Sequence, residues 1–196
     1  MNQNFNHRVL DTLLGSQTRA RVLRFFFRHE NEAFRIGEVA KAISQNYNTT
    51  ASFVEELAEV GILKEVKGSG TGSFYGVSLD FRSYPQLKEL VLQTFPIALP
   101  EVVEAIKKTG RIRLALIQGV FLGQEGSSID LFVVADDIDQ EKFAAFVKDI
   151  EGDVGKELNY TLMDTPEFTY RYNIYDRFVR NLLKKPNIKL VDSLSL

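Results

Sequence analysis

Apolar residues in the first third of the chain recur at the spacing of three short amphipathic helices. A helix is expected over residues 17–28, because Ser16 is a residue type that caps helix N-termini and the apolar positions after it repeat at helical spacing. Similar patterns predict helices over 36–43 and 49–60, and Gly61 is placed to end the last of them in the left-handed conformation. We therefore expect three helices in close succession.

A β-hairpin pattern follows these helices. Residues 62–67 alternate between apolar and polar side chains, residues 68–73 make a glycine-rich tip, and residues 74–77 return as a second strand. Three short helices followed by such a hairpin are typical of a winged helix-turn-helix. We expect this fold, a DNA-binding domain, over residues 1–82.

The remaining residues alternate between helical and strand patterns. This predicts a small mixed α/β domain over 101–196 and the α+β class for the whole chain. A connecting helix and linker are expected over 83–100, because Pro96 and Pro100 interrupt helical continuity. Thr165, directly before a proline, is placed to cap a further helix. Helices are also expected over 101–108, 140–150 and 175–183, and strands over 112–121, 130–135, 158–163 and 188–191.

The composition of the 196 residues narrows the chemistry. There is no Cys, which excludes disulfides, a thiolate nucleophile and a cysteine zinc site, and two His residues cannot build a His-rich metal centre. A net charge of −2 gives no reason to expect strong nonspecific attraction of the whole chain to nucleic acid. No run of about 18 apolar residues is present, and the N-terminus lacks the pattern of a signal peptide. We expect a cytoplasmic protein without a membrane partner.

Candidate DNA-reading residues lie around the third helix and on the hairpin. In a winged helix the third helix enters the major groove, and its N-terminal side chains meet base edges. The candidates are short polar or basic side chains, namely Lys41, Gln45, Asn48, Thr49, Thr50, Ser52, Lys64 and Lys67. Helix capping is the alternative explanation for the Asn, Thr and Ser residues. Glu55, Glu56 and Glu59 on the same helix would have to point away from phosphates.

Residues 112–137 have the layout of a nucleotidyltransferase active site from which most catalytic groups are missing. An apolar strand ends at Gly119, a polar loop follows, and a second apolar strand opens with Asp130. Such enzymes hold divalent metal with two carboxylates at positions i and i+2 of one strand and a third from a neighbouring strand. Ser128 stands at the first of these positions, and Asn159 matches the third, although a slip of one residue would bring Glu157 nearer.

The serine that follows the glycine in these enzymes is here Val120, which has no hydroxyl to contact a phosphate. The expected vestigial nucleotide site therefore consists of Gly119, Val120, Ser128, Asp130 and Asn159. Metal-assisted phosphoryl transfer needs clustered carboxylates. With one of three remaining, we expect no catalytic residues, no bound metal and no cofactor.

Other charged clusters have simpler explanations. Asp136, Asp137 and Asp139 suggest a metal site, but acidic residues are also favoured in a solvated loop before a helix. A basic patch on the last helices is a second candidate site, with a solvated helix face as the default interpretation. Its members are Arg171, Arg177, Arg180, Lys184 and Lys185.

Over nearly its whole length the chain resembles the prokaryotic family that joins a winged helix-turn-helix to a minimal nucleotidyltransferase-like domain. The resemblance rests on the order of several short segments. These are Leu14-Gly-Ser-Gln-Thr-Arg-Ala-Arg-Val-Leu23, Val60-Gly-Ile-Leu63, the returning hairpin strand with Tyr75, Ile117-Gln-Gly119, Ser127-Ser-Ile-Asp-Leu-Phe-Val-Val134, Glu157-Leu-Asn-Tyr160 and Thr165-Pro-Glu-Phe168. It implies a helix-turn-helix regulator with a mixed α/β second domain, and Mg²⁺ and nucleoside triphosphate use in members with intact sites.

The leading hypothesis is a transcriptional regulator that binds double-stranded DNA as a homodimer. Its second domain would be a pseudoenzyme that serves dimerisation, ligand sensing or partner binding, and a nucleotide or a protein is a possible partner of it. One alternative is an active metal-dependent nucleotidyltransferase that uses Asp130 with Glu157. The other is an antitoxin-like protein-interaction module.

Overall fold

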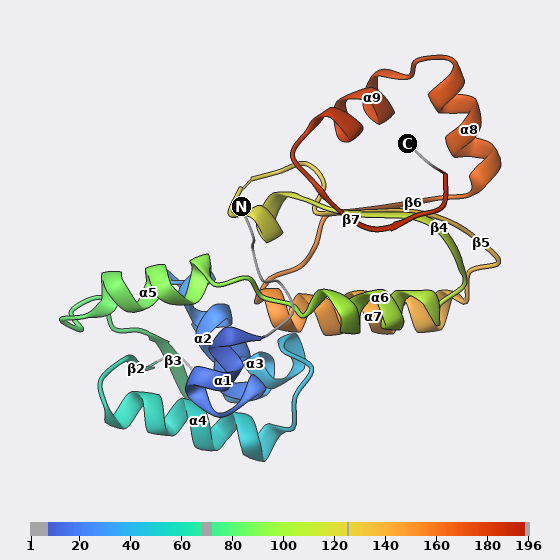
Figure 1. The fold of residues 1–196 in the computed structure, drawn as a ribbon. Helices are drawn as coiled ribbons and strands as arrows, with labels where there is room; N and C mark the ends of the chain where they lie inside the picture. Colours follow the sequence, from blue (N-terminus) through green and yellow to red (C-terminus); the bar gives the residue numbers. More distant parts are fainter. Residues whose placement is uncertain (1–7, 68–71, 125, 195–196) are drawn as a thin grey trace. The chain divides into compact units, whose positions relative to one another are not determined.

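The computed structural model describes residues 8–67, 72–124 and 126–194 of the chain. It shows a mixed α/β protein with two small sheets (Figure 1). The chain divides into two compact units. The N-terminal unit contains Arg8–Pro96 together with Lys148–Glu157, and the C-terminal unit contains Ile97–Val147 and Leu158–Leu196.

In its described residues, the N-terminal unit contains five helices, a short hairpin and the segment Lys148–Glu157. Its helices are α1 (Val9–Leu14), α2 (Gln17–Arg28), α3 (Ile36–Ala42), α4 (Tyr47–Glu59) and α5 (Tyr84–Gln93). Its strands β1 (Ala33–Phe34), β2 (Leu63–Lys67) and β3 (Ser73–Val77) form an antiparallel sheet in the order β1-β3-β2. The hairpin is therefore extended by a two-residue strand that lies between α2 and α3 in the sequence.

Two local predictions for these helices are confirmed. The Ser16 side chain accepts a hydrogen bond from the backbone N–H of Arg19, which caps α2. Gly61 has φ +80° after α4, and the N–H of Ile62 donates to the carbonyl of Leu57 at 2.9 Å, which closes the helix end. Helix α1 and strand β1 were not expected, and the hairpin tip at 68–71 lies outside the described residues.

Aromatic side chains from α2 fill the core of the N-terminal unit. Phe25, Phe26 and Phe27 are all buried, and Phe34 of β1 packs edge-on against the first two of them. Three consecutive buried residues cannot all lie on one helix face. Helix α2 is thus surrounded by protein on most sides, which explains why it contacts α1, α4, α5 and β3.

The C-terminal unit is built on a four-stranded sheet in the order β6-β5-β4-β7. Its strands are β4 (Arg111–Ile117), β5 (Leu131–Asp136), β6 (Tyr160–Met163) and β7 (Ile188–Asp192). Strand β4 is antiparallel to β5 and β7, and β5 is parallel to β6. The four strands predicted for this region are therefore present, with bounds shifted by a few residues.

Helices cover both faces of this sheet. Helices α8 (Thr165–Asn173) and α9 (Arg177–Lys184) pack on one face, over a core that includes Phe132, Phe168 and Val179. Helix α6 (Leu99–Lys107) and the first part of α7 (Gln140–Val154) lie on the other face (Figure 1). A 3₁₀ turn, η1 (Gly119–Leu122), follows β4.

The cap of α8 differs from the prediction. The residue outside the helix is Asp164, whose carboxylate accepts a hydrogen bond from the N–H of Glu167 at 2.7 Å. Thr165 lies within the first turn instead, and its hydroxyl donates to Asp136 at 3.0 Å. Both residue types are good caps, so local sequence alone does not choose between neighbours.

The compact units also differ from the expected segments. The connecting segment, residues 83–100, is divided between the units after Pro96, and α5 packs on α2 within the N-terminal unit. Residues 148–157, in the middle of the expected second domain, group with the N-terminal unit. Among the described residues, no helix combines the length and apolar character needed to cross a membrane.

Candidate functional site

The turn after β4 is held by the carboxylate of Asp130. This side chain is only 1% exposed. Its Oδ1 accepts a hydrogen bond from the N–H of Val120 at 2.9 Å, and its Oδ2 accepts one from the N–H of Asn159 at 3.1 Å. Asp130 therefore connects the end of β4 to the segment before β6 and satisfies two backbone donors, one buried and one partly buried.

Gly119 is required by this arrangement. Its φ is +60°, and a Cβ atom there would lie 2.3 Å from the Asp130 carboxylate and 2.7 Å from the Cβ of Ser127. The glycine predicted as part of the vestigial nucleotide site thus has a packing role of its own. Its neighbour Val120 is buried, with its apolar side chain in the interior.

The other two members of the predicted vestigial site do not converge on Asp130. Ser128 is exposed, and its hydroxyl accepts a weak hydrogen bond from Lys185 at 3.4 Å. The Asn159 side chain donates to the carbonyl of Ser127 at 3.3 Å, so only its backbone meets Asp130. The site brings backbone atoms together rather than side-chain ligands.

These donors do not fit a divalent cation. Mg²⁺ prefers oxygen ligands, chiefly carboxylates, in an octahedral arrangement. Here the single carboxylate is occupied by two N–H groups, and Ser128 and Asn159 contribute no negative charge. Within the described part of the chain, no group of three His, Cys, Asp or Glu side chains is placed to hold a metal ion. Glu157, the alternative to Asn159 as the third carboxylate, belongs to the N-terminal unit.

The second candidate site is the N-terminal end of α4. Asn46 caps this helix, because its Oδ1 accepts hydrogen bonds from the N–H groups of Asn48 at 2.8 Å and Thr49 at 3.4 Å. The Asn48, Thr49 and Ser52 side chains are exposed. The tight turn before α4 includes Ser44 with φ +53°, a conformation that non-glycine residues rarely adopt.

Of the predicted DNA-contacting residues, two have other roles in the structure, and the side chain of a third is outside the described residues. The Thr50 side chain is fully buried and donates to the carbonyl of Asn46 at 2.9 Å, so it is not on the surface. Gln45 is half-buried and accepts a hydrogen bond from Thr18 at 2.9 Å. Lys41 and Lys64 are exposed, whereas the side chain of Lys67 is outside the described residues.

The acidic residues of α4 lie in its second half, after the candidate DNA-reading side chains. Glu56 forms an ion pair with Arg19 of α2 at 2.7 Å, and the Arg19 guanidinium also stacks over the ring of Phe53. One carboxylate close to the polar surface of α4 is thereby balanced by a cation. Glu55 and Glu59 are exposed.

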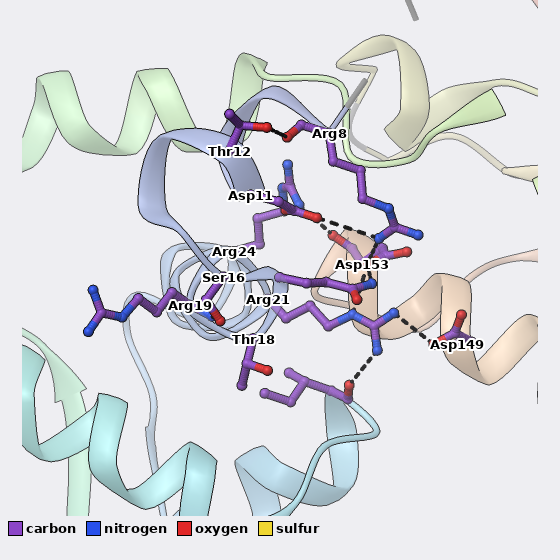
Figure 2. A network of polar contacts seen from close by, with 12 residues as sticks. Arg8, Asp11, Thr12, Ser16, Thr18, Arg19, Arg21, Arg24, Asp149 and Asp153 are labelled. Atoms are coloured by element: carbon purple, nitrogen blue, oxygen red, sulfur yellow. Dashed lines mark hydrogen bonds and ion pairs between the residues drawn. The ribbon is translucent and has the colours of Figure 1, made fainter. Parts of the chain in front are cut away.

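A buried ionic network fastens the segment Lys148–Glu157 to α2 (Figure 2). Arg21 of α2 and Asp153 of α7 are both about fully buried, at 1% exposure each. The Asp153 Oδ1 accepts hydrogen bonds from Arg21 Nε at 2.8 Å and from Arg8 Nη1 at 2.7 Å. Arg21 also reaches Asp149 at 2.7 Å and the carbonyl of Ile43, which ends α3, at 3.0 Å. One guanidinium therefore connects α2, α3 and α7.

Arginines of α2 also cap the C-terminal end of α7. Arg24 donates to the carbonyl of Asp153 at 3.3 Å, and Arg28 donates to the carbonyl of Val154 at 2.7 Å. Cations at a helix C-terminus satisfy the last carbonyls and oppose the helix dipole. Burial lowers the pKa of Arg24 to about 10, although Asp11 and Asp153 act in the opposite direction. Burial likewise raises the pKa of Asp11.

Two glycines let α7 approach α2 and α3 this closely. A Cβ at Gly152 would lie 2.7 Å from the carbonyl oxygen of Ile43, and one at Gly155 would lie 2.7 Å from the backbone of Arg24. Gly152 lies inside α7, where a glycine costs about 1 kcal/mol relative to alanine, and this close contact is the packing reason for it. The arginines, spaced three and four residues apart on α2, were not recognised as partners of α7.

Comparisons with known proteins identify no relative of this chain. No protein-family model matches the chain, and neither the curated proteins nor the solved structures searched contain a match to it.

Proposed function

We propose that this protein is a DNA-binding transcriptional regulator whose N-terminal unit is a winged helix-turn-helix. The order of helices α2, α3 and α4 followed by the β2–β3 hairpin, with β1 at the hairpin's edge, supports this proposal. In such a fold α4 is the recognition helix and the hairpin is the wing. The C-terminal unit is, in this proposal, a catalytically degenerate nucleotidyltransferase-like domain.

The observation that carries the proposal is the surface at the start of α4. Asn48, Thr49 and Ser52 are exposed there, and an amide or hydroxyl can donate to and accept from base edges. Lys41 and Lys64 add exposed cations on either side in the sequence, and phosphate contacts of this kind position a protein on DNA. Helix capping does not account for these three side chains, because Asn46 performs it.

The proposal involves phosphate contacts by the wing and base contacts by α4, and the two can be measured independently. Binding of labelled genomic fragments that flank the gene would be followed by fluorescence anisotropy at several salt concentrations. The wing variant Lys64→Glu/Lys67→Glu is expected to weaken binding to every fragment, and to reduce the slope of log K against log salt by about 2, because each phosphate contact contributes about 0.9. The variant Asn48→Ala/Ser52→Ala is expected to reduce the preference among fragments and to leave this slope unchanged.

Lys107→Glu/Lys108→Glu is the matched control, since it makes the same charge change at the C-terminal end of α6, in the C-terminal unit. The regulator proposal is wrong if no fragment is preferred at low salt, or if this control weakens binding as much as the wing variant does. Sedimentation of the protein with and without its preferred fragment tests the homodimer that paired half-sites would require.

Nucleotidyl transfer is less well supported than DNA binding. Loss of activity in Asp130→Ala would not separate a catalytic role from a structural one, because the carboxylate also holds two backbone N–H groups. A direct test is the titration of the protein with MnCl₂, whose paramagnetism broadens amide resonances near a bound ion. Selective broadening around Asp130 would favour an active enzyme, and none is expected.

A further inference from the structure

A pocket in the C-terminal unit lies between the turn after β4 and helix α9. It has a volume of about 540 Å³. One side is formed by Gln118 at the end of β4 and by Ser128 and Ile129 before β5. The other side is formed by α9 and the residues directly after it, namely Phe178, Asn181, Leu182, Lys184, Lys185 and Pro186. This size is within the range of small-molecule sites.

The walls of the pocket combine apolar surface with positive charge that no described carboxylate neutralises. Ile129, Phe178 and Leu182 provide the apolar part. Among the described residues that line the pocket none is acidic, and neither Lys184 nor Lys185 is within ion-pair distance of a described carboxylate. Lys185 donates only a weak hydrogen bond, to the Ser128 hydroxyl at 3.4 Å. Two adjacent cations that no described carboxylate neutralises attract an anion.

The buried side-chain amide of Gln118 is a second, independent indication that a ligand binds here. Gln118 is 2% exposed, and its Oε1 has no hydrogen-bond partner within the described part of the chain. A buried carbonyl oxygen without a donor costs about 1–3 kcal/mol, so native proteins rarely leave one unsatisfied. A donor group at the Gln118 end of the pocket would remove this cost.

The lysines also have a purely local explanation. They lie at the C-terminal end of α9, where cations oppose the helix dipole. This explains their preference for the helix end. It does not explain the hollow beside them, the absence of acidic residues among its described walls, or the unsatisfied amide of Gln118.

We propose that this pocket binds a small organic anion with a flat apolar body. The anionic group contacts Lys184 and Lys185, the body lies against Phe178 and Leu182, and an N–H or O–H group of the ligand donates to Gln118. Phosphate monoesters and carboxylates share this chemistry. The site does not depend on Asp130 or on metal, and the proposal holds whether or not the N-terminal unit binds DNA.

The test is a titration of the full-length, ¹⁵N-labelled protein with phenyl phosphate, followed by amide chemical shifts. Benzoate is the carboxylate arm, benzyl alcohol the neutral arm and inorganic phosphate the arm without an apolar body. Phenyl phosphate or benzoate is expected to shift the resonances of Ser128, Ile129 and Asn181–Lys185, with a dissociation constant on the order of a millimolar for so small a ligand. Benzyl alcohol and inorganic phosphate are expected to bind several-fold more weakly than the better anion.

Two variants with matched controls locate the binding. Lys184→Gln/Lys185→Gln is expected to weaken binding by about fivefold or more, as two partly exposed ion pairs would, whereas Lys107→Gln/Lys108→Gln leaves it unchanged. Asn181 is exposed, so Asn181→Trp fills the pocket without disturbing the core, and it is expected to abolish binding. The control Asn173→Trp places the same side chain at an exposed position on α8.

The proposal is overturned by any of three results. The first is that neither anion shifts these resonances at 10-fold excess over the expected dissociation constant, about 10 mM. The second is that the shifts map to residues outside the pocket. The third is that binding survives both Lys184→Gln/Lys185→Gln and Asn181→Trp in proteins whose spectra show an intact fold. The identity of the better anion then distinguishes a phosphate ester from a carboxylate as the natural ligand class.

Discussion

Asp153 and Asp149 lie one helical turn apart on α7 and bind the same arginine, but only one of them is buried. The Asp153 side chain is 1% exposed and that of Asp149 is 59% exposed. Both carboxylates are 2.7–2.8 Å from the Arg21 guanidinium. Replacing each by asparagine removes the same charge from the same partner, so the pair isolates the effect of burial.

The expected magnitudes follow from what remains after each change. Without the Asp153 carboxylate, Arg21 and Arg24 keep their charge at 1% and 2% exposure. Arg21 is then balanced only by the largely exposed Asp149, and Arg24 only by Asp11. Breaking a buried ion pair in this way costs about 3–5 kcal/mol, because it leaves a buried charge uncompensated. Without the Asp149 carboxylate, Arg21 keeps Asp153 and the carbonyl of Ile43. Exposed pairs contribute about 0–1 kcal/mol, so Asp149→Asn is expected to change little.

Urea unfolding of the full-length protein, followed by circular dichroism, measures both free energies of unfolding. Because the chain has two units, amide hydrogen exchange in α2 should be measured as well, since it reports the N-terminal unit alone. The expected result is a large loss for Asp153→Asn in both measurements and a loss below about 1 kcal/mol for Asp149→Asn. Equal effects of the two substitutions within about 0.5 kcal/mol would refute the assignment of Asp153 as the buried counter-charge of α2.

Three further predictions concern the same unit. Gly155→Ala should destabilise it by about 1–3 kcal/mol more than Gly61→Ala does, because both glycines have positive φ but only a Cβ at Gly155 meets backbone, and urea unfolding measures the difference. Asn46→Ala should cost about 1 kcal/mol by removing the cap of α4, with Asn48→Ala as a control that leaves the cap in place. Hydrogen bonds from Lys88 and Tyr84 lower the pKa of Glu30 below its ordinary value of 4.5, so the stabilisation is present above that value and is lost as the pH falls through the lowered pKa. Unfolding measured between pH 7 and pH 3 should therefore show a shallower decline in Glu30→Gln than in the unmodified protein, and parallel declines would contradict the assignment.

Local patterns were sufficient to predict most elements of both units. The cap at Ser16 and the glycine at Gly61 depend on neighbours within five residues, and both are found where the sequence placed them. Strand alternation and continuous apolar runs likewise located the four strands of the C-terminal sheet. Choices between adjacent residues of similar type, such as Asp164 and Thr165, were beyond what local propensity can decide.

The contacts that determine side-chain roles are distant in sequence, and this is where the predictions were incomplete. Thr50 has the residue type of a DNA contact but the position of a core residue, and only the packing of α4 on its neighbours reveals this. Asp130 was identified from its motif, whereas its engagement with the N–H groups of Val120 and Asn159 follows from strand pairing. The arginines of α2 and Asp153 are separated by about 130 residues, and no periodic pattern connects them.

Because its last ten residues are supplied from Lys148–Glu157, the N-terminal unit is not finished when the first 96 residues have been synthesised. Residues 97–157 take roughly 3–12 seconds to make at about 5–20 residues per second. During that interval the nascent chain holds three arginines on α2 whose partners on α7, the Asp153 carboxylate and the carbonyls of Asp153 and Val154, do not yet exist. The N-terminal unit can therefore complete its fold only after strands β4 and β5 have been synthesised. Residues 1–96 expressed alone would lack Lys148–Glu157 and could not form these contacts.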